Sequence, residues 1–556
     1  MVTKEKIKNS CKRAIQNIVY ESCTDVDLFN RPFEIEYLKN GSFQEEICNK
    51  VSDAICSGKI DGLKLHKLNH VLVPKKTLFD FRKCALTEIY DEIVYLTLVL
   101  CVAKEIERHR LLKSSKSVFS YRYKYFESGR IFDPAFNYTA FRNEVSRKAC
   151  MKKNNVMIEC DLSNFYDRLN IHRIESTLKS IDTIDRDIIS LINEVLLFWA
   201  NRDSYGLPVG SNASRILAET ALIEIDNFLK ANKVVFCRFV DDYRIFAPDS
   251  YTAHTQLAML VQRLSKEGIT LNVQKTRIVD ISDWTASEKK NVEETKDNVI
   301  KDAKENKTET ESTDNYKSKS KIIRGYSGLV PTKFRELTLT QIEKYKERNI
   351  DEIMDSLNKT ILIEPEALTD FLKTIVAQEK FDYLKKVPEL LKKYPQFIPY
   401  YIDVVIKKGS NIDEESKTLI KNSFVEWFNC EAPEYIRVYI VRLLSSDVIN
   451  DKECLLDLFK NLKRNSGEYI GRALLEALDG KLTRGEAIEI RDYFYRADNW
   501  ERRQILKLVQ ETIPETECRP FMKDIAVYTD DVFLNWMRSS YKKDILNCNF
   551  KLNTNC

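Results

Sequence analysis

The chain lacks the features of several common protein classes. Its 14 cysteines form no C-x-x-C pair and no Cys/His cluster, which argues against a zinc site. The 88 basic and 84 acidic residues nearly cancel to a net charge of +4, so any affinity for nucleic acid must come from local clusters. The sequence has no secretory leader and no apolar run of about 20 residues, so we expect free thiols in a reducing cytoplasm and no membrane partner.

The length gives room for about three domains. We expect a helical N-terminal extension at residues 1–70, an α+β domain at 71–282, a charged flexible linker at 283–325 and an α-helical domain at 326–556. Residues 286–321 of this linker are nearly free of large apolar residues, so they cannot bury enough surface to offset the entropy lost on ordering. The alternative to a flexible linker is a solvent-exposed helix.

Amphipathic runs recur after Gly325, separated by turn signals such as Gly409-Ser410-Asn411. This spacing predicts stacked helical hairpins, as in a HEAT-like solenoid, although no repeat signature is present. The runs are Ala367–Gln378, Phe381–Tyr394, Phe397–Lys408, Glu415–Phe428, Pro433–Ser446, Asp451–Arg464, Glu468–Gly480, Thr483–Ala497, Asn499–Thr512 and Pro520–Ser540.

The most informative segment is Phe239-Val240-Asp241-Asp242, within the run VVFCRFVDDYRIFA. Two adjacent acids lie between apolar, β-rich stretches, which predicts a strand, a tight turn and a second strand. Charged residues are ordinary at the tip of a hairpin. The pair by itself is therefore weak evidence for catalysis.

Asp161, further upstream, strengthens the interpretation. An apolar strand begins at Val156 and delivers Asp161 where it ends, and an amphipathic helical stretch follows. An acid at a strand end beside an acidic hairpin can hold two Mg²⁺ ions about 3.5–4 Å apart, because Mg²⁺ prefers oxygen ligands. The alternative is a helix-capping aspartate beside an unrelated turn.

A Gly/Pro loop leading into a helix pattern, Tyr205–Glu219, lies between the two acidic segments. Gly206 and Gly210 allow the backbone to approach a ligand closely, and Ser211 or Asn212 can cap the helix. The N-terminus of a helix is a favourable place for phosphate or sugar.

These three blocks resemble motifs A, B and C of reverse transcriptases. In this chain the three motifs read DLSNFYD, GLPVGSNASRILAE and FVDD. Gly268–Thr276 resembles the next palm motif, Val71–Val99 resembles the fingers, and Ser120-Tyr121-Arg122 resembles a further fingers block. The resemblance covers roughly residues 70–280. It implies a right-hand fingers–palm fold with an antiparallel sheet and helices at 71–282.

The resemblance also implies roles for individual residues. Tyr166 would pack under the sugar and exclude a 2′-hydroxyl, since an apolar ring cannot satisfy that group; the alternative is that Tyr166 is palm core. Catalysis and metal binding would fall to Asp161, Asp241 and Asp242, with Leu162 as a further metal ligand, and substrate binding to Lys75, Arg82, Tyr166, Gly210 and Lys275.

Two departures from the common pattern narrow the subgroup. Val209 replaces the usual glutamine of P-Q-G, and Arg215 replaces the usual proline after serine. With the long helical tail, this form is similar to bacterial reverse transcriptases of abortive infection and phage defence. That likeness implies a cytoplasmic bacterial enzyme that makes DNA from dNTPs with Mg²⁺, or with Mn²⁺ in its place.

Several points stay open at this stage. The subgroup includes enzymes that prime on one of their own tyrosines and work without a template, so an RNA template and a homo-oligomer are both open. The alternatives are a retron or group II intron type that copies a dedicated RNA, and an inactive palm that serves as a scaffold or sensor. The basic stretches Lys113–Lys116 and Arg142–Lys153 would contribute contacts to nucleic acid.

Overall fold

A computed structural model describes residues 2–24, 26–75, 80–285, 332–361, 363–430, 432–462, 468–528 and 530–540. The chain forms two compact units: the first contains Met1–Leu68 and Thr87–Tyr326, and the second contains Asn69–Leu86 and Ser327–Cys556. Most of the predicted linker, 283–325, lies outside the described residues. The predicted domain boundaries therefore stay predictions.

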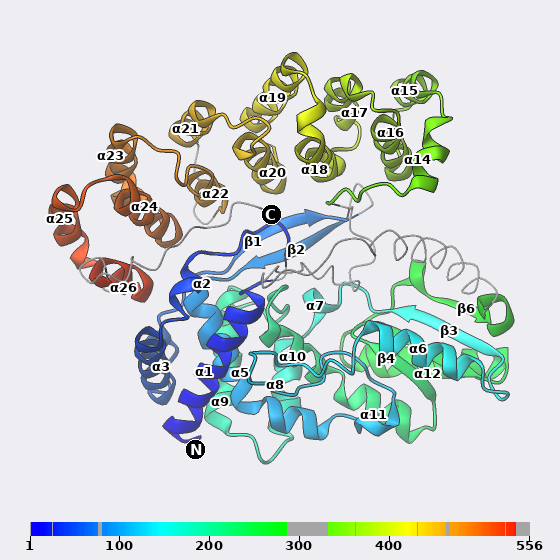
Figure 1. Cartoon of the computed structure of the whole chain (residues 1–556). Helices are drawn as coiled ribbons and strands as arrows, with labels where there is room; N and C mark the ends of the chain where they lie inside the picture. The colour runs from blue at the N-terminus through cyan, green and yellow to red at the C-terminus, as the bar shows by residue number, and fades with distance from the viewer. Residues whose placement is uncertain are drawn as a thin grey trace, which may run out of the picture. The chain divides into compact units, whose positions relative to one another are not determined.

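The first unit is built around a four-stranded antiparallel sheet with the order β4-β5-β3-β6 (Figure 1). Its strands are β3 (Val156–Asp161), β4 (Val235–Phe239), β5 (Asp242–Ala247) and β6 (Arg277–Asp280). β4 and β5 are joined by the two residues Val240 and Asp241, which confirms the predicted strand–turn–strand. β3 lies in the middle of the sheet because its apolar residues are buried on both faces.

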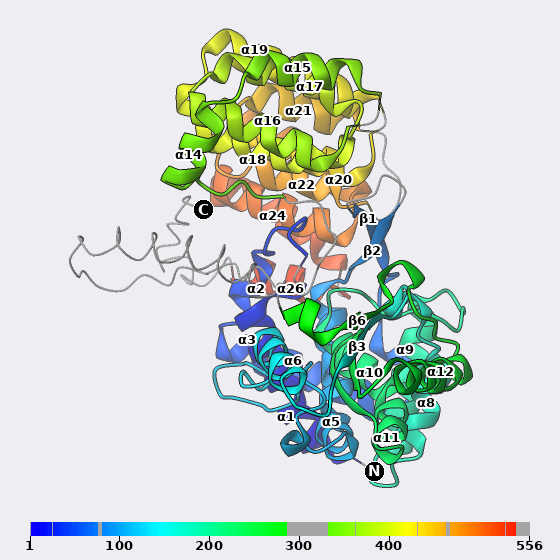
Figure 2. The same ribbon diagram turned by 90° about the vertical axis from the view of Figure 1, so that its right-hand side faces the viewer.

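The two faces of this sheet have different covers. Helix α12 (Ser250–Lys266) packs on β3 and β5, and helix α6 (Tyr138–Ala149) packs on β4 and β5. Figure 2 shows the two helices on opposite sides of β3. Under α6, Met157 and Phe246 form an apolar cluster with Phe141 of the helix. Because side chains alternate along a strand, Glu159 and Asp161 lie on the same face as Met157, nearer the other end.

Helix α5 (Ile89–His109) is the core of the helical part of the first unit. All of its residues from Ile89 to Ala103 are buried and most of them are apolar, so this part is an interior helix. Helices α1, α9 and α10 pack against it. The other helices are α1 (Lys4–Glu21), α2 (Glu34–Tyr37), α3 (Gly41–Cys56), α4 (Ile60–Leu63), α7 (Phe165–Arg168), α8 (Ile171–Lys179), α9 (Arg186–Trp199), α10 (Asn212–Ala221) and α11 (Ile223–Ala231).

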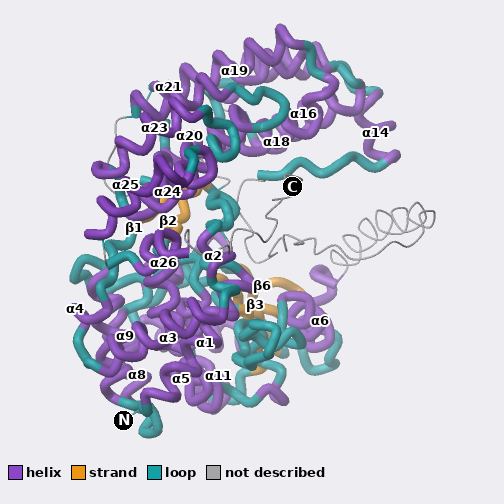
Figure 3. The backbone as a smooth tube through the Cα atoms, turned by 60° about the vertical axis from the view of Figure 1, so that its left-hand side comes forward, coloured by secondary structure: helices purple, strands orange, loops and turns teal. Residues whose placement is uncertain are grey.

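The second unit is largely helical, as the tube in Figure 3 makes plain. Helices α18, α20, α22, α24 and α26 contact one another in succession, and α19, α21 and α23 each contact an even-numbered neighbour, so the helices form two layers (Figure 1). The α-helices are α14 (Leu339–Lys346), α15 (Ile350–Lys359), α16 (Pro365–Gln378), α17 (Val387–Leu391), α18 (Ile398–Lys408), α19 (Glu414–Asn429), α20 (Glu434–Ser445), α21 (Lys452–Asn461), α22 (Ile470–Ala477), α23 (Arg484–Tyr493), α24 (Asn499–Thr512), α25 (Glu515–Asp524) and α26 (Val532–Ser540).

The same unit contains the antiparallel hairpin of β1 (Asn69–Pro74) and β2 (Phe81–Leu86). The fold is therefore a mixed α+β domain with small antiparallel sheets, followed by a largely helical C-terminal region. In the described part of the chain, no helix has both the length and the apolar character needed to cross a membrane.

Candidate active site

The predicted acids meet at one end of the sheet of the first unit. Asp161, the last residue of β3, is paired in register with Asp242, the first residue of β5. The backbone N–H of Leu162 donates to the carbonyl oxygen of Asp241 at 3.1 Å. Two segments that are far apart in the sequence thus place Asp161, Leu162, Asp241 and Asp242 together.

The turn that carries Asp241 has an unusual backbone. Val240 has φ = +57°, in the left-handed region that β-branched residues rarely adopt. Such a conformation costs on the order of 1–3 kcal/mol and persists only when the surrounding structure holds it. One of those restraints is a 2.8 Å hydrogen bond from Nη1 of Arg238 to the carbonyl oxygen of Val240.

Lys275 lies beside Asp161. The segment that carries it is joined to the end of β3 by two backbone hydrogen bonds of 2.8 Å, from Asn272 N–H to Asp161 O and from Ser163 N–H to Thr270 O. Nζ of Lys275 is 3.1 Å from Oδ2 of Asp161. The predicted substrate-binding lysine is therefore an immediate neighbour of a predicted metal ligand.

A chain of ion pairs crosses the sheet next to the acids. Arg244 of β5 pairs with Asp242 and, through Nε at 3.3 Å, with Oε1 of Glu159 on β3. Nε of Arg277 on β6 lies 2.5 Å from Oε2 of the same glutamate. Glu159, Arg244 and Arg277 were not predicted from the sequence as part of this site. The available signal was the presence of charged residues inside otherwise apolar strands.

Two of these carboxylates, those of Asp241 and Asp242, have raised pKa values. The pKa of Asp241 is raised to about 7, first by partial removal from water and then by the charge of Asp161. Removal from water also raises the pKa of Asp242 to about 6, although Arg244 opposes that rise. A cluster of oxygen donors that resists ionisation without a cation suits a hard divalent ion such as Mg²⁺. The residues present therefore fit the metal that the resemblance implies.

Another group in the first unit has a compact set of potential metal ligands. Ligand atoms of His66, Glu88 and Asp91 all lie within 4.8 Å of one another. These groups have structural partners, however. Asp91 accepts from the N–H of His66 at 2.8 Å and contacts its Nδ1 at 3.0 Å, and Glu88 caps α5 by accepting from Tyr90 N–H at 2.7 Å. We interpret this group as a helix cap.

Tyr166 lies next to the loop that precedes α10. It is half-buried on α7, and its carbonyl oxygen accepts from the N–H of Leu207 at 3.0 Å. Ser211 caps α10 by accepting from Ala213 N–H at 3.1 Å, which confirms the predicted loop-to-helix transition and selects Ser211 over Asn212 as the cap. The role of Tyr166 in sugar selection stays a prediction.

Gly210 is required by its surroundings. It has φ = +120°, and a Cβ atom there would lie 2.6 Å from Oγ1 of Thr24. The N-terminal segment thus packs directly against this glycine, a contact that the sequence did not reveal. Its predicted role in shaping the floor of a nucleotide site stays a prediction.

Lys75 and Arg82 lie on the β1–β2 hairpin, which belongs to the second unit. Nζ of Lys75 is 3.1 Å from Oδ1 of Asp80, and Arg82 is paired in register with Val73. Their expected role in holding a triphosphate stays a prediction.

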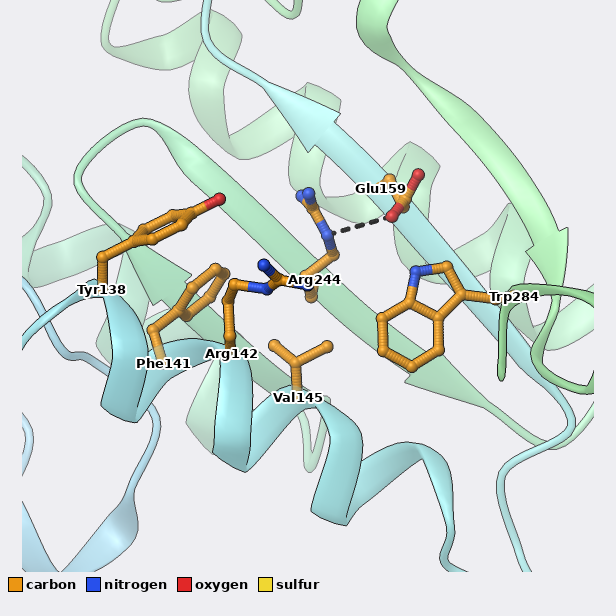
Figure 4. Close-up of a pocket in the computed structure, with 7 residues that line it drawn as sticks. All are labelled: Tyr138, Phe141, Arg142, Val145, Glu159, Arg244 and Trp284. Atoms are coloured by element: carbon orange, nitrogen blue, oxygen red, sulfur yellow. Dashed lines mark ion pairs between the residues drawn. The ribbon is translucent and has the colours of Figure 1, made fainter. Parts of the chain in front are cut away.

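A pocket of about 400 Å³ opens on the sheet face that carries the acids. It combines aromatic, basic and acidic side chains from α6, β3, β5 and the segment after β6, which Figure 4 shows converging on one space. Glu159 in its wall is two residues from Asp161, a separation of roughly 6.6 Å along a strand. The lining residues are Tyr138, Phe141, Arg142, Val145, Glu159, Arg244 and Trp284.

Comparisons with solved structures find distant likenesses to telomerases. Telomerase from Candida albicans, in complex with the TWJ fragment of telomeric RNA, has a TM-score of 0.29 and 14% identity over 77% of this chain and 67% of that one. Apo telomerase from Candida tropicalis has a TM-score of 0.29 and 13% identity over 71% and 74% of the two chains. At these scores the likenesses carry no weight for fold or function. No curated protein matches the chain.

A family model gives a more specific result. Residues 97–312 match the model described as "Reverse transcriptase (RNA-dependent DNA polymerase)". The matched part includes Asp161, the loop before α10, Asp241 and Lys275, and so contains the whole end of the sheet described above. Over residues 97–312 the chain is therefore similar to the reverse transcriptase family, and this match implies the chemistry of a nucleotidyltransferase.

Proposed function

We propose that this domain synthesises DNA from deoxynucleoside triphosphates by two-metal nucleotidyl transfer. The observation that carries the proposal is the meeting of Asp161 and Asp241 beside the ends of β3 and β5, where removal from water and the charge of Asp161 raise the pKa of Asp241. An inactive palm is disfavoured, because carboxylates held this close destabilise the fold unless a cation compensates them.

The residues divide the work of the reaction. Asp161 and Asp241 hold the metals through carboxylate oxygens, with the backbone of Leu162 beside them. When bound, Mg²⁺, or Mn²⁺ in its place, supplies a lowered pKa for the attacking 3′-hydroxyl and neutralises the leaving pyrophosphate. Asp242 pairs with Arg244 and thereby supports the turn from outside the metal ligands.

In this proposal Lys275 binds a substrate phosphate once a metal occupies Asp161. A metal at Asp161 competes with the ion pair between Asp161 and Lys275, so metal binding releases the ammonium group toward a substrate phosphate. Lys75 and Arg82 grip the triphosphate, Gly210 shapes the nucleotide floor, and Tyr166 excludes ribose by filling the space under the sugar.

The pocket beside the acids supports nucleic acid as the partner. Arg142 and Arg244 can meet phosphate oxygens, and the rings of Trp284 and Tyr138 can stack on a base. The basic stretches predicted from sequence contribute only in part, because Lys148 is buried and donates to the carbonyl oxygens of Lys116 and Phe236, both at 2.9 Å.

For the cell, we propose a role in bacterial phage defence, on the likeness of the sequence blocks to that subgroup. The helical region is then a HEAT-like module, which its two layers of short helices support. A retron or group II intron type remains the second candidate. Expression of the wild type and of Asp241→Ala in a phage-challenged bacterium tests the defence role, and sequencing the nucleic acid that co-purifies with the protein tests whether it copies a dedicated RNA.

The biochemical proposal has a direct test. Purified protein is incubated with labelled dNTPs and Mg²⁺, with a primed RNA, with a primed DNA, and without added nucleic acid. We expect labelled polymer in at least one arm and none with EDTA. Absence of polymer in all arms with fully folded protein would count against DNA synthesis.

A further inference from the structure

We propose that Arg238 is a positioning residue for catalysis: its guanidinium holds the Val240 turn and so fixes the direction in which Asp241 faces the metals. The inference rests on the proposed metal role of Asp241. It adds a part of the machinery that lies in the core behind the acids, and Arg238 itself touches no substrate.

The guanidinium of Arg238 is fully buried between two carboxylates from different helices. Nε and Nη2 donate to Oδ1 and Oδ2 of Asp226 on α11, at 2.9 and 2.5 Å. Nη2 and Nη1 donate to Oε2 and Oε1 of Glu219 on α10, at 2.9 and 3.2 Å. Both carboxylates are thus bound in the two-pronged geometry that only an arginine provides.

One further donor of the same guanidinium reaches the turn. Nη1 donates to the carbonyl oxygen of Val240 at 2.8 Å, one residue before Asp241. Because Val240 is held at φ = +57°, the turn would relax toward an ordinary backbone conformation without such a restraint. A rotation at Val240 swings the carboxylate of Asp241 away from Asp161.

A second buried arginine fixes the same assembly. Nη2 of Arg110 donates to Oε2 of Glu219 at 2.5 Å and to the carbonyl oxygen of Ser120 at 2.8 Å. The hydroxyl of Ser120 also donates to Glu219. The network therefore joins the helix that follows the Gly210 loop, the Ser120 segment and the acidic turn into one rigid unit.

The variant Arg238→Lys distinguishes a role of Arg238 in positioning the turn from a role in balancing the charge of the buried carboxylates. It preserves the positive charge, but a single ammonium on a flexible stem cannot bond both carboxylates and the Val240 carbonyl in this geometry. The turn then loses its restraint while the buried carboxylates keep a counter-charge. Asp226→Asn weakens the same network more gently, since the side chain keeps its shape.

The chain offers a matched control in the helical region. Arg503 is also almost completely buried, with 1% of its surface exposed, and its Nε donates to Oδ2 of Asp531 at 2.7 Å. Arg503→Lys makes the same chemical change in a buried ion pair outside the reverse transcriptase domain. Both variants are compared with the wild type at a temperature where circular dichroism shows each to be folded.

The measurements are kcat, KM for dNTP, and the Mg²⁺ concentration that gives half of the maximal rate. We expect Arg238→Lys, and to a smaller degree Asp226→Asn, to lower kcat and raise the Mg²⁺ requirement by about 10- to 100-fold, the usual effect of losing a residue that orients a metal ligand. KM for dNTP changes little, and Arg503→Lys keeps the wild-type Mg²⁺ requirement even if its Tm falls.

Failure of the inference and failure of the proposed function give different results. If Asp241→Ala is inactive while Arg238→Lys and Asp226→Asn keep the wild-type kcat and Mg²⁺ requirement, Arg238 is only structural. If Arg238→Lys does not fold, Asp226→Asn alone decides. If Asp241→Ala retains activity, the proposed metal site itself is wrong.

Discussion

At the scale of single residues, the site is defined by charges held close together at the end of β3. Asp161, Asp241 and Asp242 supply three carboxylates, and Lys275 and Arg244 supply two cations that pair with the first and the last of them. The pKa of Asp241 is raised further than that of Asp242, because Asp241 is removed from water and faces the charge of Asp161. The site thus holds one more carboxylate than cations, and a bound divalent metal ion would compensate that excess of negative charge.

This excess of negative charge gives a pH-dependent prediction. The pKa of Asp241 rises from 3.8 to about 7 on folding, so between these pH values the folded protein binds one proton more than the unfolded chain does. The stability that this proton contributes is fully present below about pH 4 and is lost as the pH rises through 7. Mg²⁺ binds only the ionised carboxylate, so the increase in Tm on adding Mg²⁺ should grow between about pH 6 and 8. In Asp241→Asn that growth should be absent. An equal increase at both pH values in the wild type would contradict the assignment.

Tyr166 gives a second prediction at this scale. Tyr166→Ala should raise the use of rNTPs relative to dNTPs by about tenfold or more, because it opens space under the sugar. Tyr166→Phe keeps the ring and should keep the wild-type ratio. Both are measured by competition of labelled dNTP and rNTP in one reaction. A ratio unchanged in the alanine variant would make Tyr166 a core residue only.

At the scale of elements, the site depends on how strands and helices far apart in sequence are joined. β3 and β5 set the register of the acids, α6 covers only the far half of the sheet face, and the pocket with Arg142 and Trp284 occupies the remaining space (Figure 4). A strand of nucleic acid that enters the metal site along this face would meet the pocket first.

This arrangement predicts a measurable electrostatic contact. Arg142→Ala should weaken oligonucleotide binding and reduce the slope of log Kd against log salt by about one, the effect of losing one phosphate contact. Arg108→Ala, at the exposed end of α5 and paired with Glu105 at 2.8 Å, is the control and should leave the slope unchanged. Fluorescence anisotropy over a salt series measures both. Equal slopes for Arg142→Ala and wild type would remove the pocket from the interface.

Elements with strong local patterns were predictable from sequence. The β4–β5 hairpin, the end of β3 at Asp161 and the cap of α10 follow from alternation, turn residues and capping chemistry, which act over a few residues. The run Pro520–Ser540 was less predictable: the structure divides it among α25, a 3₁₀ turn at Ile525–Val527 and α26, because apolar spacing alone does not mark a break.

The supporting charges could not be predicted in the same way. The pairs of Arg238 with Asp226 and of Arg244 with Glu159 depend on the register and packing of separate elements, and no local pattern contains that information. The contact of Thr24 with Gly210 has the same origin. Motifs thus predicted which residues react, and the structure was needed to see what holds them.

At the scale of the whole molecule, the open question is what begins DNA synthesis. The subgroup that the sequence resembles includes enzymes that prime on one of their own tyrosines, and the helical region of this chain is rich in tyrosines. Burial now reduces the candidates: Tyr400, Tyr401, Tyr435 and Tyr439 are buried in the helical stack. Tyr383, Tyr493 and Tyr528 are half-buried, and among the described tyrosines of the helical region Tyr495 alone is exposed, over half of its surface. A tyrosine hydroxyl must reach the metals to act as a nucleophile, so the buried ones are disfavoured.

If the tail primes synthesis, Tyr495 is the residue that we expect to carry the DNA. Protein purified from cells, denatured and digested with protease, should then yield DNA with a residual peptide on its 5′ end. Tyr495→Phe should lose the adduct, and Tyr435→Phe, which changes a buried ring, should keep it. DNA that separates fully from the wild-type polypeptide on denaturation would mean that the primer is a nucleic acid.

The central claim is that Asp161 and Asp241 hold the metals for nucleotidyl transfer, and one measurement tests it most directly. Incorporation of labelled dNTPs with Mg²⁺ is compared among the wild type, Asp161→Ala and Asp241→Ala, with the Tm of each protein recorded. The account predicts that both variants lose incorporation by a factor of at least about 10³. Their Tm should stay near or above that of the wild type, because each substitution removes a negative charge that repels the neighbouring carboxylates and leaves the core packing unchanged. Incorporation near the wild-type rate in either folded variant would contradict the account.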